Sequence, residues 1–151
     1  MEKKKVFIYN HIIKVGTKNG LSIVSHNHIN GIVIPSLRDI RALILVQSKY
    51  SPIYSPNKTG LLVNTNVSEN KDNRARIFNK YKKFIYDKNA KIEKLYPEET
   101  KRIRDNYRDK ELEKRLNDLY RPYYVKNQEK IASEINTVFK ENNYGMKLYI
   151  L

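Results

Sequence analysis

Two histidines one residue apart are the first side chains in this sequence that could do chemistry. His26 and His28 lie in SHNHIN (25–30), and on a strand they would point to the same face, where they could bind a metal ion or serve a nuclease. Few partners are available, because the chain has no Cys, the next acidic residue is Asp39 and the third histidine is His11. The pattern favours a structural or RNA-facing pair, and we predict no metal, no cofactor and no catalytic residue.

The carboxylates give no further catalytic pattern. Eleven of the 16 acidic residues lie between residues 69 and 119, interleaved with Lys and Arg, which is typical of solvated ion pairs. The sequence contains neither a Gly-rich phosphate loop nor a Gly-x-Ser-x-Gly turn. We therefore expect a binding protein and not an enzyme.

Positive charge is the strongest signal in the sequence. The 151 residues include 30 Lys and Arg against 16 Asp and Glu, which gives a formal net charge of +14. Such an excess attracts polyanions and releases counterions when it meets phosphates, so nucleic acid is the leading partner. An anionic membrane or a secreted toxin would be alternatives, but no apolar run is long enough to span a bilayer and the N-terminus does not read as a secretory signal, so we expect no membrane partner.

Tyrosines stand among these cations in NKYKKFIYDKNAK (79–91) and LYRPYYVK (119–126). In RNA-binding proteins, cations contact phosphates while aromatic rings stack on bases. The alternative is that the tyrosines are half-buried and the lysines only solubilise the chain. RNA is favoured over DNA because the sequence shows no helix-turn-helix, zinc-finger or basic-zipper pattern.

The charge pattern divides the chain into three parts. Residues 1–68 and 120–151 carry the apolar patterning, whereas residues 69–119 mix 16 basic with 11 acidic residues. We predict an α+β protein of two small units, helix-strand-helix-strand-strand and then strand-helix-strand. A charged helical insertion, residues 69–119, joins them.

In the first part, apolar spacing predicts a helix over residues 6–15, although its β-branched residues make a strand the competing prediction. A strand is expected over residues 28–35. Ser36 is a typical N-cap for the helix that follows it. Residues 51–67 predict a hairpin around a Pro-Asn-Lys-Thr-Gly turn.

In the remainder, two helices are expected over residues 72–89 and 97–120, the second with Pro at its first position. Residues 120–126 are predicted to be extended, because a proline disfavours helix in the residue before it. Asn127 is expected to cap a further amphipathic helix, and a closing strand is expected over residues 146–150.

The order and spacing of these elements resemble the eighth protein of the small ribosomal subunit, in its bacterial and organellar form. The resemblance covers about residues 1–68 and 119–151, and the charged part between them has no counterpart. It is carried by IYNHIIKVGTKNG (8–20), INGIVIPSLRDIRALILVQSKYSPIY (29–54), GLLVNTNV (60–67) and LYRPYYVKNQEKIASEINTVFKENNYGMKLYIL (119–151).

The resemblance implies a structural protein that binds the central domain of small-subunit rRNA beside neighbouring ribosomal proteins. Position within the pattern then suggests the RNA contacts. Helix N-termini would add anion-binding backbone groups. The expected contact residues are Lys18, Asn19, Ser36, Arg38, Arg121, Tyr123 and Lys126.

The family's chain continues beyond its corresponding last strand, whereas this sequence stops at Leu151, so we expect a second chain to complete the sheet. Only four Ala stand beside abundant Lys, Asn, Ile and Tyr, which indicates AT-rich coding, as in organelle, phage, plasmid or parasite genomes. Together with the resemblance, this bias implies the mitochondrion as the location. The alternative function is a small basic nucleic-acid-binding effector or inhibitor encoded by a phage or plasmid. A nuclease using the two histidines comes third.

Overall fold

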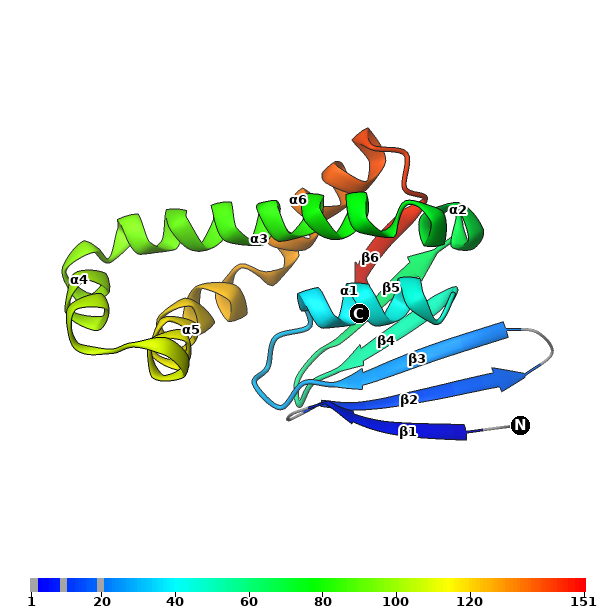
Figure 1. Cartoon of the computed structure of the whole chain (residues 1–151), viewed down its shortest axis with the longest axis horizontal. Helices are drawn as coiled ribbons and strands as arrows, with labels where there is room; N and C mark the ends of the chain where they lie inside the picture. The colour runs from blue at the N-terminus through cyan, green and yellow to red at the C-terminus, as the bar shows by residue number, and fades with distance from the viewer. Residues whose placement is uncertain (1–2, 9–10, 19–20) are drawn as a thin grey trace.

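The computed structural model describes the backbone of residues 3–8, 11–18 and 21–151, and the side chains from residue 23 onward. The fold is α+β, as predicted. One six-stranded sheet has the order β1-β2-β3-β4-β5-β6, so each strand lies beside its neighbour in sequence (Figure 1). The strands are β1 Lys3–Ile8, β2 His11–Lys18, β3 Leu21–Asn27, β4 Tyr50–Tyr54, β5 Thr59–Asn64 and β6 Met146–Ile150.

The sheet is mixed. All neighbouring strands are antiparallel except β3 and β4, which are parallel and are joined through helix α1 (Leu37–Leu45). Five helices separate β5 from β6 along the chain, yet these two strands pair directly, with Leu62 opposite Leu148. The last strand therefore completes the same sheet that the first 68 residues begin.

The five helices extend to one side of the sheet. They are α2 Val67–Asp72, α3 Arg74–Leu95, α4 Pro97–Asn106, α5 Asp109–Lys126 and α6 Gln128–Glu141. Figure 1 shows α3 continuing past the sheet, α4 at the far end, and α5 running back toward α6. We call residues 83–126 the helical arm. Its two long helices are tied by the Tyr124 hydroxyl, which donates to Asn89 Oδ1 at 2.7 Å.

One apolar core runs from the sheet into the arm. Near the sheet it is formed by side chains of α1, α3 and α6 against β5 and β6, including Ile40, Phe139 and Leu148. In the arm it narrows to a single seam between helices, where Ile92 and Ile103 are buried. The arm is thus held by one thin apolar stripe, and its other faces are exposed to solvent.

Several predicted elements are confirmed. The Ser36 hydroxyl accepts a hydrogen bond from the Asp39 N–H at 3.2 Å, and the Asp39 carboxylate accepts one from the Ser36 N–H at 2.7 Å, so α1 begins with a reciprocal capping box. The hairpin β4–β5, Pro at the first position of α4, and the closing strand β6 also lie where the sequence placed them.

Two predictions in the first part are wrong. Within the predicted helix over 6–15, residues 6–8 belong to strand β1 and residues 11–15 to strand β2, in agreement with their β-branched content, and residues 9–10 lie outside the described ones. Residues 28–35 are not a strand, because β3 ends at Asn27 and Gly31, with a φ of +80°, turns the chain. Within this loop, the side-chain oxygen of Asn30 accepts a hydrogen bond from the Ile32 N–H at 3.1 Å.

Residues 120–126 are not extended, because α5 continues through Pro122 to Lys126. Tyr120 and Tyr124 lie four residues apart on the face that packs into the core, and burying both rings offsets the hydrogen bond that proline cannot donate. The helix predicted over 97–120 is instead divided into α4 and α5, at Tyr107 and Arg108. The chain consequently forms one sheet with a helical arm, and not the two separate strand-and-helix units that we predicted.

Candidate nucleic-acid interface

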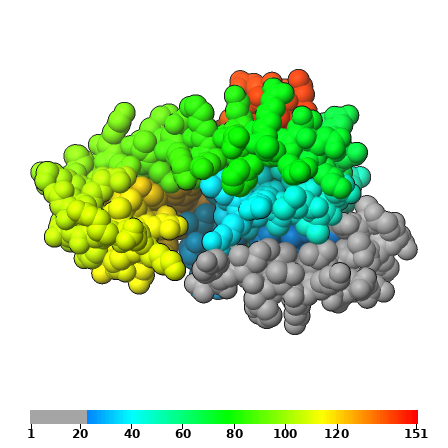
Figure 2. All heavy atoms as spheres, in the orientation of Figure 1, coloured from blue at the N-terminus to red at the C-terminus, as the bar shows by residue number. Residues whose placement is uncertain are grey.

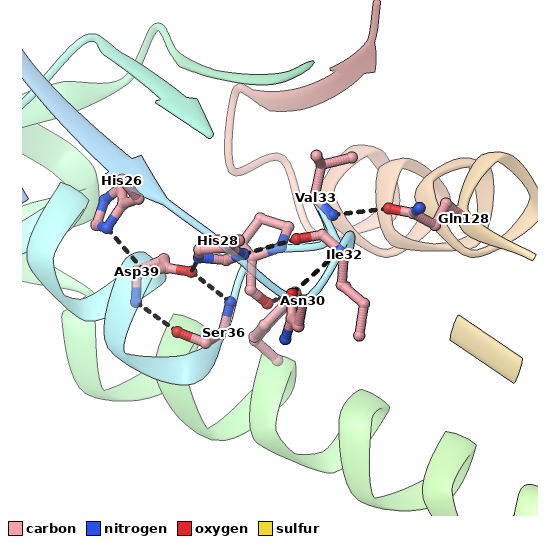
Figure 3. A network of polar contacts seen from close by, with 10 residues as sticks. His26, His28, Asn30, Ile32, Val33, Ser36, Asp39 and Gln128 are labelled. Carbon is pink, nitrogen blue, oxygen red and sulfur yellow. Dashed lines mark hydrogen bonds and ion pairs between the residues drawn. The ribbon is translucent and has the colours of Figure 1, made fainter. Parts of the chain in front are cut away.

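The two histidines meet the same carboxylate. His26 comes from the end of β3, His28 follows that strand, and Asp39 lies in the first turn of α1 (Figure 3). His26 Nδ1 is 2.8 Å from one carboxylate oxygen of Asp39, and His28 Nε2 is 3.0 Å from the other. All three residues are at least 96% buried. We call them the His-Asp-His cluster.

Asp39 lies close enough to His28 to favour the charged form of its ring. His28 Nδ1 donates to the Ile32 carbonyl oxygen at 2.7 Å, and His28 Nε2 lies within ion-pair distance of Asp39. Burial lowers the pKa of His28, but the hydrogen bond and charge of Asp39 and the Ile32 carbonyl raise it by more. Burial likewise raises the pKa of Asp39, while bonds from both histidines hold it well below its usual range.

This cluster fixes the start of α1 against β3. Its side chains are turned inward and bonded to one another, so they offer no open face to a substrate. Within the described residues, no group of three or more His, Cys, Asp or Glu is arranged to hold a metal ion. The cluster therefore positions α1, and with it the cations on the outer side of that helix.

Further cations lie on α3, the helix beside α1. Figure 2 shows α1 directly beside the first half of α3 on the viewed face. The Tyr81 hydroxyl donates to the Pro35 carbonyl oxygen at 2.5 Å, and Arg74 lines the same hollow as Leu45, so the two helices run antiparallel. We define the basic surface as the cations of α1 and of residues 74–82 of α3: Arg38, Arg41, Arg74, Arg76, Lys80 and Lys82.

Charge is distributed unevenly between this surface and the arm. Residues 38–82 include nine Lys and Arg against three acidic residues, one of which is the buried Asp39, whereas residues 83–121 include twelve against nine. Six ion pairs of 2.5–2.9 Å join the exposed charges of the arm: Lys83–Asp87, Glu93–Arg104, Glu99–Arg102, Lys101–Asp105, Glu111–Arg115 and Asp118–Arg121.

Three arginines of the basic surface differ from these paired charges. In the part of the chain that the structure describes, no carboxylate lies within ion-pair distance of Arg41, Arg74 or Arg76. Arg74 donates only to the Lys71 carbonyl oxygen, at 3.2 Å, and Lys82 stands over the ring of Tyr86. The charges of Arg41, Arg74 and Arg76 are therefore not neutralised by carboxylates of the described residues.

The structure places the predicted contact residues differently. Arg38 is exposed in the first turn of α1, within the basic surface. The Ser36 hydroxyl accepts from the Asp39 N–H in the capping box, which holds its side chain at the start of α1. Lys18 ends a strand and does not follow a helix, its side chain lies outside the described ones, and Asn19 lies outside the described residues.

The second group of predicted residues lies on α5. Arg121 is exposed but its guanidinium is 2.9 Å from Asp118, and Tyr123 is half-buried against the core. Lys126 is exposed at the end of the helix. Gln128, just beyond, accepts from the Val33 N–H at 2.7 Å, so the end of α5 lies against the loop that leads into α1.

Sequence reasoning missed Arg41 and Arg74. The spacing of Arg38 and Arg41, three residues apart on the polar side of an amphipathic helix, was a readable signal. No pattern in the sequence indicates that α3 lies beside Arg38 and Arg41, because this contact joins segments more than thirty residues apart.

The outer edge of β6 is the other surface of interest, and a hollow of about 880 Å³ lies between β6 and α6. The Asn136 side-chain amide donates to the Leu148 carbonyl oxygen at 2.8 Å and accepts from the Leu148 N–H at 2.7 Å. It thus stands where a further strand would pair. A second chain at this edge stays a prediction.

Comparison of the chain with known protein families, curated proteins and solved structures finds no match. Among the described residues, none of the helices combines the length and the apolar content that crossing a membrane requires.

Proposed function

We propose that this chain is an RNA-binding protein and that the basic surface of α1 and α3 is its RNA interface. Following the resemblance, its RNA is small-subunit rRNA, and its role is a structural one in a mitochondrial ribosomal subunit, beside neighbouring ribosomal proteins and without catalysis. The observation that carries the proposal is that Arg41, Arg74 and Arg76 are exposed and have no carboxylate within ion-pair distance among the described residues, whereas seven of the twelve cations in residues 83–121 are ion-paired.

Phosphate binding gives a physical reason for this difference. Unpaired exposed cations repel one another and contribute nothing to stability, so their concentration on one surface fits a polyanionic partner. Each cation that meets a phosphate releases condensed counterions and adds about one to the salt dependence of binding. The arm, with its charges paired, acts as a spacer that reaches along the rRNA or toward protein neighbours.

The test compares two double variants of equal charge change. Arg41→Gln with Arg74→Gln removes two cations of the basic surface, while Arg102→Gln with Arg115→Gln removes two exposed, ion-paired cations of the arm. Binding to a transcript of the central domain of small-subunit rRNA is measured by fluorescence anisotropy over a series of salt concentrations.

We expect the basic-surface variant to bind about 10- to 100-fold more weakly, with a salt slope reduced by about two. The arm variant should bind nearly as the wild type does. Equal losses in the two variants would refute the basic surface as the interface. Cosedimentation with small ribosomal subunits tests the ribosomal assignment separately, and a chain that stays in the supernatant would contradict it.

A further inference from the structure

A small hollow separates α1 from the beginning of α3 within the basic surface. Its volume is about 210 Å³, and both of its charged lining residues are arginines. The rest of the lining is apolar. The lining residues are Arg41, Ile44 and Leu45 from α1, and Arg74, Ala75 and Phe78 from α3.

Phe78 is the informative residue of this hollow. It is half-buried, yet it is not among the partly buried apolar side chains that pack against the main core. Within the described part of the chain its ring makes no ring–ring contact and no cation–π contact, so neither neighbouring arginine covers it. Leu45, on the opposite wall, is 50% exposed. The hollow is therefore an apolar slot whose aromatic wall has no partner.

The cations continue along both walls of the slot. Lys82 lies four residues after Phe78 on the same side of α3, and Arg38 lies three residues before Arg41 on the same side of α1. Because the two helices are antiparallel, these two cations fall at the same end of the slot. A chain of phosphates could follow this line while one base enters the hollow.

We propose that this hollow holds one unpaired base of an RNA, stacked on the ring of Phe78, while Arg41 and Arg74 contact the adjacent phosphates. The inference rests on the proposed RNA-binding function and names the RNA feature that it recognises. Aromatic rings flanked by cations bind unstacked bases in this way, because every base has a π face and every nucleotide a phosphate. At about 210 Å³ the hollow suits one planar ring and not a larger ligand.

An acidic protein segment is the competing occupant, since it would also meet the two arginines. The apolar slot favours a flat ring over a carboxylate side chain, because a carboxylate would lose water against Ile44 and Leu45 without gaining a hydrogen bond there. We therefore argue for the base and make the acidic segment an outcome of the test.

The experiment uses two RNAs with the same number of phosphates, a hairpin with an unpaired loop and a blunt duplex. Phe78→Leu keeps an apolar wall but removes the stacking ring. We expect it to bind the hairpin about 5- to 100-fold more weakly, to bind the duplex as the wild type does, and to keep the wild-type salt slope. Tyr96→Leu, at the far end of α3 with a 48% exposed ring, is the matched control and should change neither affinity.

A second variant covers the case in which Phe78→Leu fails to fold, which circular dichroism would show. Ala75→Phe fills the hollow from an exposed position and should also weaken hairpin binding selectively. Unchanged hairpin affinity in the folded variants, with wild-type RNA binding intact, would overturn the base site and leave the proposed function standing. Failure of the wild type to bind either RNA would overturn both, and binding of a polyglutamate peptide that Phe78→Leu abolishes would reassign the hollow to a protein partner.

Discussion

Asp39→Asn tests the role of the His-Asp-His cluster. The substitution keeps the shape of the side chain and an oxygen that can accept from the Ser36 N–H, but it removes the negative charge. His28 is 4% exposed and its Nε2 lies 3.0 Å from Asp39, which raises its pKa, so in the variant a protonated His28 would remain buried without a counter-charge. The variant therefore isolates the buried ion pair from the helix cap.

The expected cost follows from this geometry. Removing one partner of a buried ion pair costs about 3–5 kcal/mol, because the remaining charge is left uncompensated. His28 can relieve part of this by losing its proton, which limits the loss to the lower end of the range. Since domains are stable by about 5–15 kcal/mol, we expect the free energy of unfolding to fall by about 3 kcal/mol, a large fraction of the total.

The assay is urea unfolding followed by far-UV circular dichroism at about pH 6, where His28 is protonated in the wild type. Asp72→Asn is the matched control, because Asp72 is exposed at the end of α2 and should change stability by less than about 0.5 kcal/mol. A loss below about 1 kcal/mol for Asp39→Asn would refute the assignment of a buried charged pair.

Three further outcomes follow from the same contacts. The pKa of His28 is raised in the folded chain, so its contribution to stability is complete below about pH 6.5 and is lost as the pH rises through the raised pKa. His28→Gln should therefore reduce the fall in the free energy of unfolding between about pH 6 and pH 9, measured by urea titration at each pH. Gly145→Ala should cost about 1–3 kcal/mol by thermal melting, because φ is +61° and the new Cβ would lie 2.6 Å from Asn66 Cγ; an unchanged melting temperature would contradict the geometry. Gln128→Leu leaves the Val33 N–H buried without its acceptor and should cost about 1–3 kcal/mol, measurable as a lower urea midpoint.

Local signals in the sequence predicted a large part of the fold. Ser36 capped α1 as expected, since an N-cap and its helix lie within a few residues of each other. The face of α6 that carries Ile131, Ile135 and Phe139 is buried as its spacing predicted. Such predictions succeed because the interacting residues are close in sequence.

The wrong predictions have a common cause. Pro122 disfavours helix in the residue before it. Burial of the Tyr120 and Tyr124 rings in the core stabilises α5 by more than this local cost, so the helix stays continuous. Residues 6–15 carry an apolar pattern that suits helix or strand, and the pairing of β1 with β2 makes residues 6–8 and 11–15 strands. In each case a contact outside the segment outweighed a local preference.

The candidate interface also combines features that local sequence predicts with features that depend on contacts between distant segments. The sequence by itself determined that the chain is strongly basic, that few partners for a metal site stand near His26 and His28 along the chain, and that Arg38 lies in the first turn of a helix capped by Ser36. Only the tertiary structure decided that Asp39 joins the histidines, that α3 brings Arg74 and Phe78 beside α1, and that β6 completes the first sheet. The physical reason is that composition and periodicity are local properties, whereas the neutralisation of a charge or the exposure of a ring depends on which distant segments fold against it.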